Sequence, residues 1–409
     1  MSSISRRGFI KGATLSPLTF TAMAQQNSSL GPNNQFDFVI AGAGHNSLLS
    51  AAYLAKAGFS VVVLEGRAMI GGGAKTAEVL FPGFKQDLCS TVHSGFAANP
   101  AYRNNEINLR DFGYELMDPE IVVHIPFLDG ASLTVFRGDV DRTAETIAQV
   151  SKKDAETFRR LAPSRAKFLS TPQSERAISR DGIFWQRLGE LSGYDAGRQI
   201  WESPYMQAAN LTTGHFSGVP GSDLGTGSQA VQMFSHLRGR PIPRGGSGML
   251  TVALGRFIEA HDGVVLTSKP VEQLIIEGGR CVGVECLDGS QFRARRGVIS
   301  TIHIKHLLQM APRELWGEEL LDIVDIWQQE HAMFAFNFAL SESPRYAFSE
   351  GGTIAPCEAA ILQRPESIFM LNSDQATGEL NIEDYPLQIV HASNVDPTRV
   401  PAGFGAVKI

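Results

Sequence analysis

The chain has 409 residues, more than one hydrophobic core usually supports, so its length predicts two domains. Hydrophobic residues make up 43% and charged residues 19%, which excludes a disordered protein and a protein with many membrane spans. The net charge of −6 disfavours nucleic acid as a partner, because the phosphates would repel it. The four cysteines contain no CxxC pair, so neither a zinc site nor a disulfide framework is predicted.

The amino terminus has the three-part layout of an export signal. Arg6 and Arg7 precede Phe-Ile-Lys, a weakly apolar stretch and the small residues 22–24. This arrangement resembles the twin-arginine signal, which implies a signal peptide at residues 1–24, recognition of Arg6 and Arg7 by the export machinery, and a periplasmic or exported protein. The alternative is a chance Arg-Arg pair in an irregular start. No segment is long enough to span a bilayer, and the sequence leaves peripheral membrane contact open.

A linker at residues 25–35 leads into a strand, a glycine turn, a helix and a second strand. The apolar run 36–41 predicts the first strand, and the helical pattern begins near His45 and is ended by Gly58. The run 60–64 predicts the second strand, which makes a βαβ unit of about 30 residues. An ordinary glycine-capped α/β turn is the alternative interpretation.

Each residue of the glycine turn has a physical role in binding a dinucleotide. Gly42 permits the tight turn, and Gly44 lets the backbone approach a pyrophosphate. The helix N-terminus near His45 offers free N–H groups and a positive dipole end to that anion. Glu65, at the end of the second strand, can accept hydrogen bonds from ribose hydroxyls. Ser47 replaces the third glycine of the fingerprint and is small enough to keep the helix near the strand.

A second glycine cluster, residues 71–73, follows the acid after a short gap. Because three successive glycines have no side chains, the backbone can lie directly against a flat ligand, and Arg67 can face a phosphate. Together with Thr76 and the Phe-Pro-Gly-Phe of residues 81–84, these motifs resemble the phytoene-desaturase-like branch of the FAD-dependent amine oxidase superfamily, which includes carotenoid desaturases and ketolases. Amine oxidases commonly have Arg at the position of Gly73, which favours the desaturase-like branch.

A later segment carries the same resemblance. Residues 243–248 (Pro-Arg-Gly-Gly-Ser-Gly) precede a predicted helix at 251–261 and predicted strands at 264–266, 271–276 and 281–287. In the family, this motif opens the helix that crosses back beneath the flavin. Without the resemblance, its glycines are hairpin and cap residues.

The resemblance and the turn together predict an FAD site whose residues lie in the two glycine clusters, beside the acid and at the start of a late strand. They are Gly42, Gly44, His45, Asn46, Ser47, Glu65, Gly66, Arg67, Gly71, Gly72, Gly73 and Val271. The resemblance implies that Val271 meets the adenine through its backbone.

The predicted fold class is α/β, with a Rossmann-like FAD-binding domain and an inserted α+β substrate domain of mixed sheet and helices. Residues 36–115 and 241–310 are assigned to the FAD-binding domain, and residues 116–240 and 311–409 to the substrate domain.

In the substrate domain, residues 120–136 predict a β-hairpin, and helices are predicted at 154–161, 184–192 and 229–237. The apolar residues at 334, 336, 338, 370 and 371 could line a hydrophobic cavity. The alternation over residues 333–338 more often means a core-facing strand.

The sequence offers no Ser/His/Asp or Cys/His triad, no HExxH motif and no metal site. His93 is the one catalytic candidate, because in the resembling family the segment after the glycine cluster runs toward the flavin. The alternative is a hydrogen-bonded structural histidine. Flavin chemistry needs no obligatory side-chain base, since the cofactor itself is the electron sink.

The resemblance implies an FAD-dependent oxidoreductase that oxidises or desaturates a lipophilic, isoprenoid or carotenoid-like substrate by hydride transfer to flavin N5. Family members usually run on further, to a segment that covers the flavin, whereas residues 406–409 read as the start of a strand, so a C-terminal truncation is expected. The alternative is therefore a non-catalytic binder of apolar ligands that has lost the flavin. A nicotinamide-dependent dehydrogenase would not explain the clusters at 71–73 and 243–248.

Overall fold

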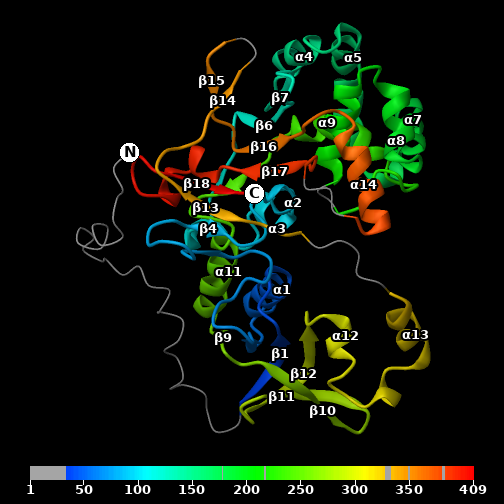
Figure 1. Cartoon of the computed structure of the whole chain (residues 1–409). Coiled ribbons are helices and arrows are strands. Elements are labelled where there is room, and N and C mark those ends of the chain that lie inside the picture. The colour runs from blue at the N-terminus through cyan, green and yellow to red at the C-terminus, as the bar shows by residue number, and fades with distance from the viewer. Residues whose placement is uncertain (1–33, 177, 216–217, 328–332, 349–350, 380–382) are drawn as a thin grey trace. The chain divides into compact units, whose positions relative to one another are not determined.

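The structure is a computed structural model that describes residues 34–176, 178–215, 218–327, 333–348, 351–379 and 383–409 (Figure 1). The predicted signal peptide at residues 1–24 lies outside the described residues. Contacts between residues divide the chain into two units. Unit 1 contains the residues up to Ile70 and Ile258–Glu318, and unit 2 contains Gly71–Phe257 and Glu319–Ile409.

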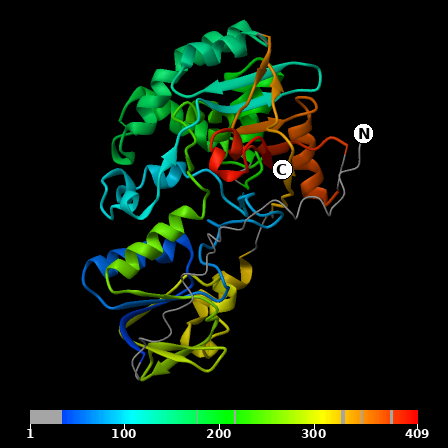
Figure 2. The same cartoon turned by 90° about the vertical axis from the view of Figure 1, so that its left-hand side faces the viewer.

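Unit 1 is built on a six-stranded sheet with the order β10-β11-β12-β1-β2-β9. Strand β1 pairs in parallel with β2 and β12, β2 pairs in parallel with β9, and β10, β11 and β12 form an antiparallel meander. Helix α1 (His45–Lys56) packs a buried face of mostly alanine residues against β1 and β2 (Figure 2). The strands are β1 (Gln35–Ala41), β2 (Val61–Leu64), β9 (Val264–Leu266), β10 (Val271–Glu277), β11 (Arg280–Cys286) and β12 (Gln291–Ser300).

Helix α1 and the strands β1, β2, β9, β10 and β11 lie within one or two residues of the predicted elements, because these elements carry continuous apolar runs with glycines near their boundaries. The sheet buries a compact apolar core that includes Val39, Val62, Leu64 and Phe292. The short helix α12 (Ile304–Leu307) follows β12 in unit 1. Helix α13 (Glu318–Ile326) comes next and, after its first residue, belongs to unit 2.

Unit 2 contains a second six-stranded sheet, in the order β13-β18-β17-β16-β6-β7. Its pairs are antiparallel except for β16 with β6, where Ala359 lies opposite His124. The strands are β6 (Ile121–Pro126), β7 (Ser132–Phe136), β13 (Asn337–Leu340), β16 (Glu358–Ile361), β17 (Leu387–Val390) and β18 (Gly405–Lys408). Three short pairs complete the unit: β3 (Thr76–Ala77) with β4 (Gln86–Asp87), β5 (Leu116–Met117) with β8 (Ile242–Pro243), and β14 (Tyr346–Ala347) with β15 (Thr353–Ile354).

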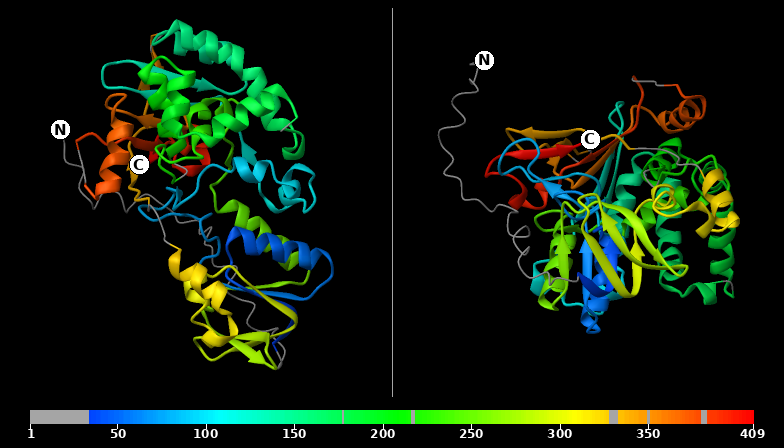
Figure 3. Two further views of the ribbon diagram at one scale, coloured as in Figure 1. Left: turned by 90° about the vertical axis from the view of Figure 1, so that its right-hand side faces the viewer. Right: turned by 90° about the horizontal axis from the view of Figure 1, so that it is seen from below.

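Seven helices of unit 2 bury the largest apolar cluster of the described residues (Figure 3). They are α4 (Val140–Ala148), α5 (Lys152–Ser170), α7 (Arg180–Glu190), α8 (Gly193–Ile200), α9 (Pro204–His215), α10 (Gln232–His236) and α14 (Ser367–Thr377). Unit 2 also contains the short helices α2 (Ser94–Ala97), α3 (Pro100–Arg103) and α6 (Gln173–Arg176). Helix α11 (Met249–Ala260) begins in unit 2 and ends in unit 1.

The predicted α/β fold class, with its mixed-sheet and helical second part, is confirmed. The predicted hairpin at 120–136 is confirmed as β6 and β7. The predicted helix at 154–161 is one part of the much longer α5, because Ser151 caps a pattern that continues past Pro163. The predicted helix at 229–237 is instead a 3₁₀ turn followed by the short α10.

The alternation over residues 333–338 does not mark a core strand. Phe334, Phe336 and Phe338 are 81%, 58% and 43% exposed. The strand itself, β13, begins only at Asn337 and lies at the edge of its sheet, where a side chain has a neighbouring strand on one side only.

The contact units and the predicted domains have different borders. The predicted FAD-binding segments 71–115 and 241–257 have most of their contacts inside unit 2. No described helix is long and apolar enough to cross a membrane.

Candidate functional site

The glycine turn of unit 1 leaves the start of α1 without a side-chain cap. Gly42 has a φ of +100°, which disfavours any residue with a Cβ, and an added Cβ would lie 2.7 Å from the Thr301 hydroxyl. Gly44, the N-cap of α1, has a φ of −73°, which any residue can adopt, and no side chain caps the first turn. His45 and Asn46 are exposed. The first N–H groups of a twelve-residue helix are therefore available to an anion.

Glu65 holds this turn from the end of β2. Its two carboxylate oxygens accept 3.0 Å hydrogen bonds from the backbone N–H groups of Ala43 and Arg67. A carboxylate has about four acceptor positions, so Glu65 keeps capacity for the hydroxyls of a ribose. The arrangement fits the pyrophosphate and the ribose of a dinucleotide.

Ser47 fills the position of the missing third glycine. Its side chain is fully buried and donates a hydrogen bond of 3.0 Å to the carbonyl of Gly44. The Thr301 hydroxyl, which follows β12, donates to the Ser47 hydroxyl at 3.2 Å. Serine thus holds the start of α1 close to the sheet.

The segment before β10 is hydrogen-bonded to the backbone of Glu65 and Arg67. The N–H groups of Ser268 and Lys269 donate to the carbonyls of Arg67 and Glu65 at 2.9 and 2.8 Å. A Cβ on Gly66 would stand 3.4 Å from Pro270, the residue before Val271. Unit 1 therefore brings together nine of the twelve predicted cofactor residues: Gly42, Gly44, His45, Asn46, Ser47, Glu65, Gly66, Arg67 and Val271.

The second glycine cluster, Gly71, Gly72 and Gly73, belongs to unit 2. Gly71 and Gly72 have φ values of +129° and +58°, so this turn requires glycine whatever it contacts. The carbonyl of Gly73 accepts hydrogen bonds of 3.0 Å from both the backbone N–H and the hydroxyl of Ser90.

His93 stands in a chain of hydrogen bonds that ends at the carbonyl of Gly73. Its Nδ1 is 2.9 Å from the Tyr114 hydroxyl, and its Nε2 is 2.8 Å from the Ser247 hydroxyl, which lies 2.7 Å from that of Ser90. Because Ser90 donates to Gly73, Ser247 must donate to Ser90 and accept from Nε2–H. Nδ1 then accepts a hydrogen bond from the Tyr114 hydroxyl. Burial raises the pKa of Tyr114, so this hydroxyl keeps its proton.

This chain engages both ring nitrogens of His93, which is 6% exposed. The geometry suits the structural alternative, and a catalytic role for His93 stays a prediction. No group of three or more His, Cys, Asp or Glu side chains able to hold a metal ion occurs within the described ranges.

A buried ion cluster, which sequence reasoning missed, lies next to this chain. We call it the Asp87 cluster; it consists of Asp87, Arg399, Thr76, Ser247 and Asp396. Asp87 accepts hydrogen bonds from two guanidinium nitrogens of Arg399 at 3.0 and 2.6 Å, from the Thr76 hydroxyl at 2.6 Å and from the Ser247 N–H at 2.9 Å. Burial alone would raise the pKa of Asp87, but the charge and hydrogen bonds of Arg399 hold that pKa below its usual value.

The Asp87 cluster explains the glycines of residues 243–248. A Cβ on Gly246 or on Gly248 would lie 2.3 or 2.9 Å from atoms of Thr76. Asp396 accepts from the N–H of Gly245 at 2.6 Å. No local pattern marks these partners, because Asp87 and Arg399 are 312 positions apart in the chain.

Comparisons with known proteins agree with this geometry. The sequence model of the family described as flavin containing amine oxidoreductase matches residues 48–326. A limonene dehydrogenase subunit from Castellaniella defragrans is 27% identical over 401 residues, which covers 90% of this chain and 71% of that protein. Pyridine nucleotide-disulfide oxidoreductase domain-containing protein 2 of Rattus norvegicus is 24% identical, over 99% of this chain and 78% of that protein.

Solved structures share the fold. An oxidoreductase from Methanosarcina mazei superposes with a TM-score of 0.61 at 17% identity, over 91% of this chain and 78% of that chain. A putrescine oxidase variant redesigned in its cofactor binding gives a TM-score of 0.58 at 15% identity, over 91% and 74% of the two chains.

Proposed function

Since the chain belongs to the family of flavin-containing amine oxidoreductases, we propose that it is an FAD-dependent enzyme that oxidises or desaturates a lipophilic, isoprenoid-like substrate. FAD as the cofactor and oxidoreduction as the reaction class are confirmed by the family. The observation that carries the proposal is the uncapped N-terminus of α1 beside the fixed carboxylate of Glu65.

The residues of the chain bind and orient the cofactor. The N–H groups at the start of α1 bind the pyrophosphate, and Glu65 accepts from the ribose while its own position is fixed by Ala43 and Arg67. When bound, FAD supplies the electron sink that accepts a hydride from the substrate. The enzyme therefore needs to position a C–H bond and exclude water rather than supply a nucleophile.

The lipophilic substrate class is supported by the name of one relative, the limonene dehydrogenase of Castellaniella defragrans. Membership of the phytoene-desaturase-like branch is part of the proposal and rests on Gly73 at the position where amine oxidases commonly have Arg. Export by way of Arg6 and Arg7 and peripheral membrane contact are proposed on the sequence alone.

The test is anaerobic reduction of the flavin-loaded protein, followed at the flavin band near ~450 nm. Limonene, phytoene and putrescine are supplied separately as a cyclic hydrocarbon, a linear isoprenoid and an amine. We expect a hydrocarbon to bleach the band and the amine to leave it unchanged. Bleaching by putrescine alone would contradict the proposed substrate class but not the cofactor.

A further inference from the structure

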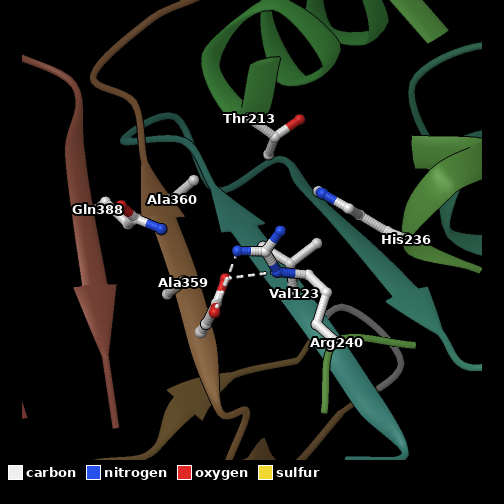
Figure 4. Close-up of a pocket in the computed structure, with 8 residues that line it drawn as sticks. Val123, Thr213, His236, Arg240, Ala359, Ala360 and Gln388 are labelled. Carbon is white, nitrogen blue, oxygen red and sulfur yellow. Dashed lines mark hydrogen bonds and ion pairs between the residues drawn. The ribbon is translucent and has the colours of Figure 1, made fainter. Parts of the chain in front are cut away.

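A small cavity of unit 2 lies between the strands β6, β16 and β17 and the helices α9 and α10 (Figure 4). The room for the centre of a water-sized sphere is about 10 Å³, which suffices for a single water-sized group. The lining residues are Val123, Thr213, His236, Arg240, Glu358, Ala359, Ala360 and Gln388.

The side chain of His236 points into this cavity (Figure 4). Its side chain is 3% exposed, and neither ring nitrogen is hydrogen-bonded to any described residue. A buried polar group without a partner is costly, so native structures generally supply one. Burial and the charge of Arg240 hold the pKa of His236 well below its usual value, so the ring is neutral and has one donor and one acceptor nitrogen.

Arg240 and Glu358 set the charge of the cavity. Nε and Nη2 of Arg240 donate to the two carboxylate oxygens of Glu358 at 2.9 and 3.3 Å. The remaining nitrogen, Nη1, points toward Thr213 and His236 (Figure 4). The two charges compensate each other. An anion in the cavity would be repelled by the carboxylate of Glu358, and a cation would be repelled by the guanidinium of Arg240. The cavity therefore favours an uncharged ligand.

Thr213 adds an acceptor. Its hydroxyl already donates to the carbonyls of Ala209 and Asn210, at 2.9 and 3.1 Å, so only oxygen lone pairs remain. A ligand facing Arg240, a neutral imidazole and Thr213 must be able both to accept and to donate. A hydroxyl does both, whereas a carbonyl only accepts.

We propose that this cavity is a binding site for one uncharged hydroxyl oxygen, which accepts from Arg240 and pairs with a ring nitrogen of His236. The oxygen is supplied either by a resident water or by the hydroxyl of an alcohol. The site is separate from the residues assigned to the cofactor and does not rest on the proposed function.

The test compares two substitutions of similar size in the flavin-loaded full chain. His236→Gln keeps a donor and an acceptor, and His236→Leu keeps neither. If an oxygen occupies the site, His236→Leu leaves that oxygen with fewer hydrogen-bond partners. The melting temperature of the Leu variant should then lie about 2–4 °C below that of the Gln variant. Met233→Leu, on the same helix and outside the cavity lining, is the control and should change the melting temperature little.

The opposite order would overturn the proposal. In a dry cavity, the imidazole of wild-type His236 is an unsatisfied polar group, and His236→Leu would raise the melting temperature above both the wild-type and Gln values. A crystal structure provides a second readout that does not depend on how the variants fold. It should show an oxygen within hydrogen-bond distance of His236 and Arg240 Nη1, and an empty cavity would also overturn the proposal.

Addition of methanol separates the two sources of the oxygen. If methanol replaces the water, the wild type should lose less thermal stability in methanol than His236→Leu does. If the site keeps a resident water, the two proteins should lose stability in parallel. The order of the melting temperatures and the crystal structure decide whether an oxygen occupies the site, and the methanol experiment then assigns its source.

Discussion

The dinucleotide turn of unit 1 and the Asp87 cluster of unit 2 both depend on glycine, but for different physical reasons. Gly44 has an ordinary φ of −73° and precedes exposed residues and uncapped N–H groups. Gly246 and Gly248 instead make room for Thr76, and the polar groups around them are hydrogen-bonded within the protein. A glycine beside unused hydrogen-bonding groups indicates a ligand site, whereas a glycine beside satisfied ones indicates packing.

The largest expected effect comes from breaking the Asp87 cluster. Arg399→Met would leave the buried carboxylate of Asp87 without its counter-charge, which should lower the free energy of unfolding by about 3–5 kcal/mol. Urea denaturation measures this loss. Arg198→Met is the matched control, because it breaks an exposed pair with Asp195 and should cost less than about 1 kcal/mol. Equal losses in the two variants would show that the Asp87 cluster does not stabilise unit 2.

Acid should weaken unit 2 through its buried histidines. Burial lowers the pKa of both His124 and His391 to about 4. An unfolded histidine has a pKa near 6.5. Between pH 4 and pH 6.5, these histidines therefore bind protons in the unfolded chain and stay neutral in the folded chain. The stabilisation is complete above about pH 6.5 and falls toward pH 4, by up to about 3 kcal/mol per histidine.

Urea denaturation at several pH values measures this slope. His391→Gln should make this slope shallower, because one of the buried histidines that contribute to it no longer titrates. A slope that is unchanged in the variant would show that His391 does not contribute.

Glu65→Gln tests the dinucleotide turn. The amide nitrogen of glutamine cannot accept from the N–H of Ala43 or of Arg67, and the ribose loses a charged acceptor. We expect the Kd for FAD to rise about 10- to 100-fold, as measured by the change in flavin fluorescence on binding. Glu78→Gln, which affects an exposed hydrogen bond to Gly83, is the control and should leave the Kd unchanged. A similar rise in both variants would refute a specific role for Glu65.

The smallest effect is expected from Ser247→Ala, which interrupts the chain between His93 and Ser90. The loss should be about 1 kcal/mol of unfolding free energy, with no change in the pH profile of flavin reduction. If the pH profile moves instead, His93 takes part in proton transfer and the structural interpretation is wrong.

The sequence predicted unit 1 well because its signals are local. Each strand of the βαβ unit is a continuous apolar run, Gly58 ends the helix, and Glu65 follows the second strand directly. The Asp87 cluster could not be predicted, because its charged partners are far apart in the chain and neither belongs to a motif. The alternating residues 333–338 misled for a related reason: alternation shows which side chains share a face, and says nothing of whether another element covers that face.

The central claim is that the dinucleotide turn of unit 1 binds FAD, and a visible spectrum tests it directly. The purified protein, incubated with FAD and then desalted, should keep the flavin bands near ~375 and ~450 nm. Gly44→Val should lose them, because valine tolerates the backbone conformation of residue 44 and yet places a branched side chain where the pyrophosphate approaches. A wild-type protein that keeps no flavin, or a Gly44→Val variant that keeps as much as the wild type, would contradict the account.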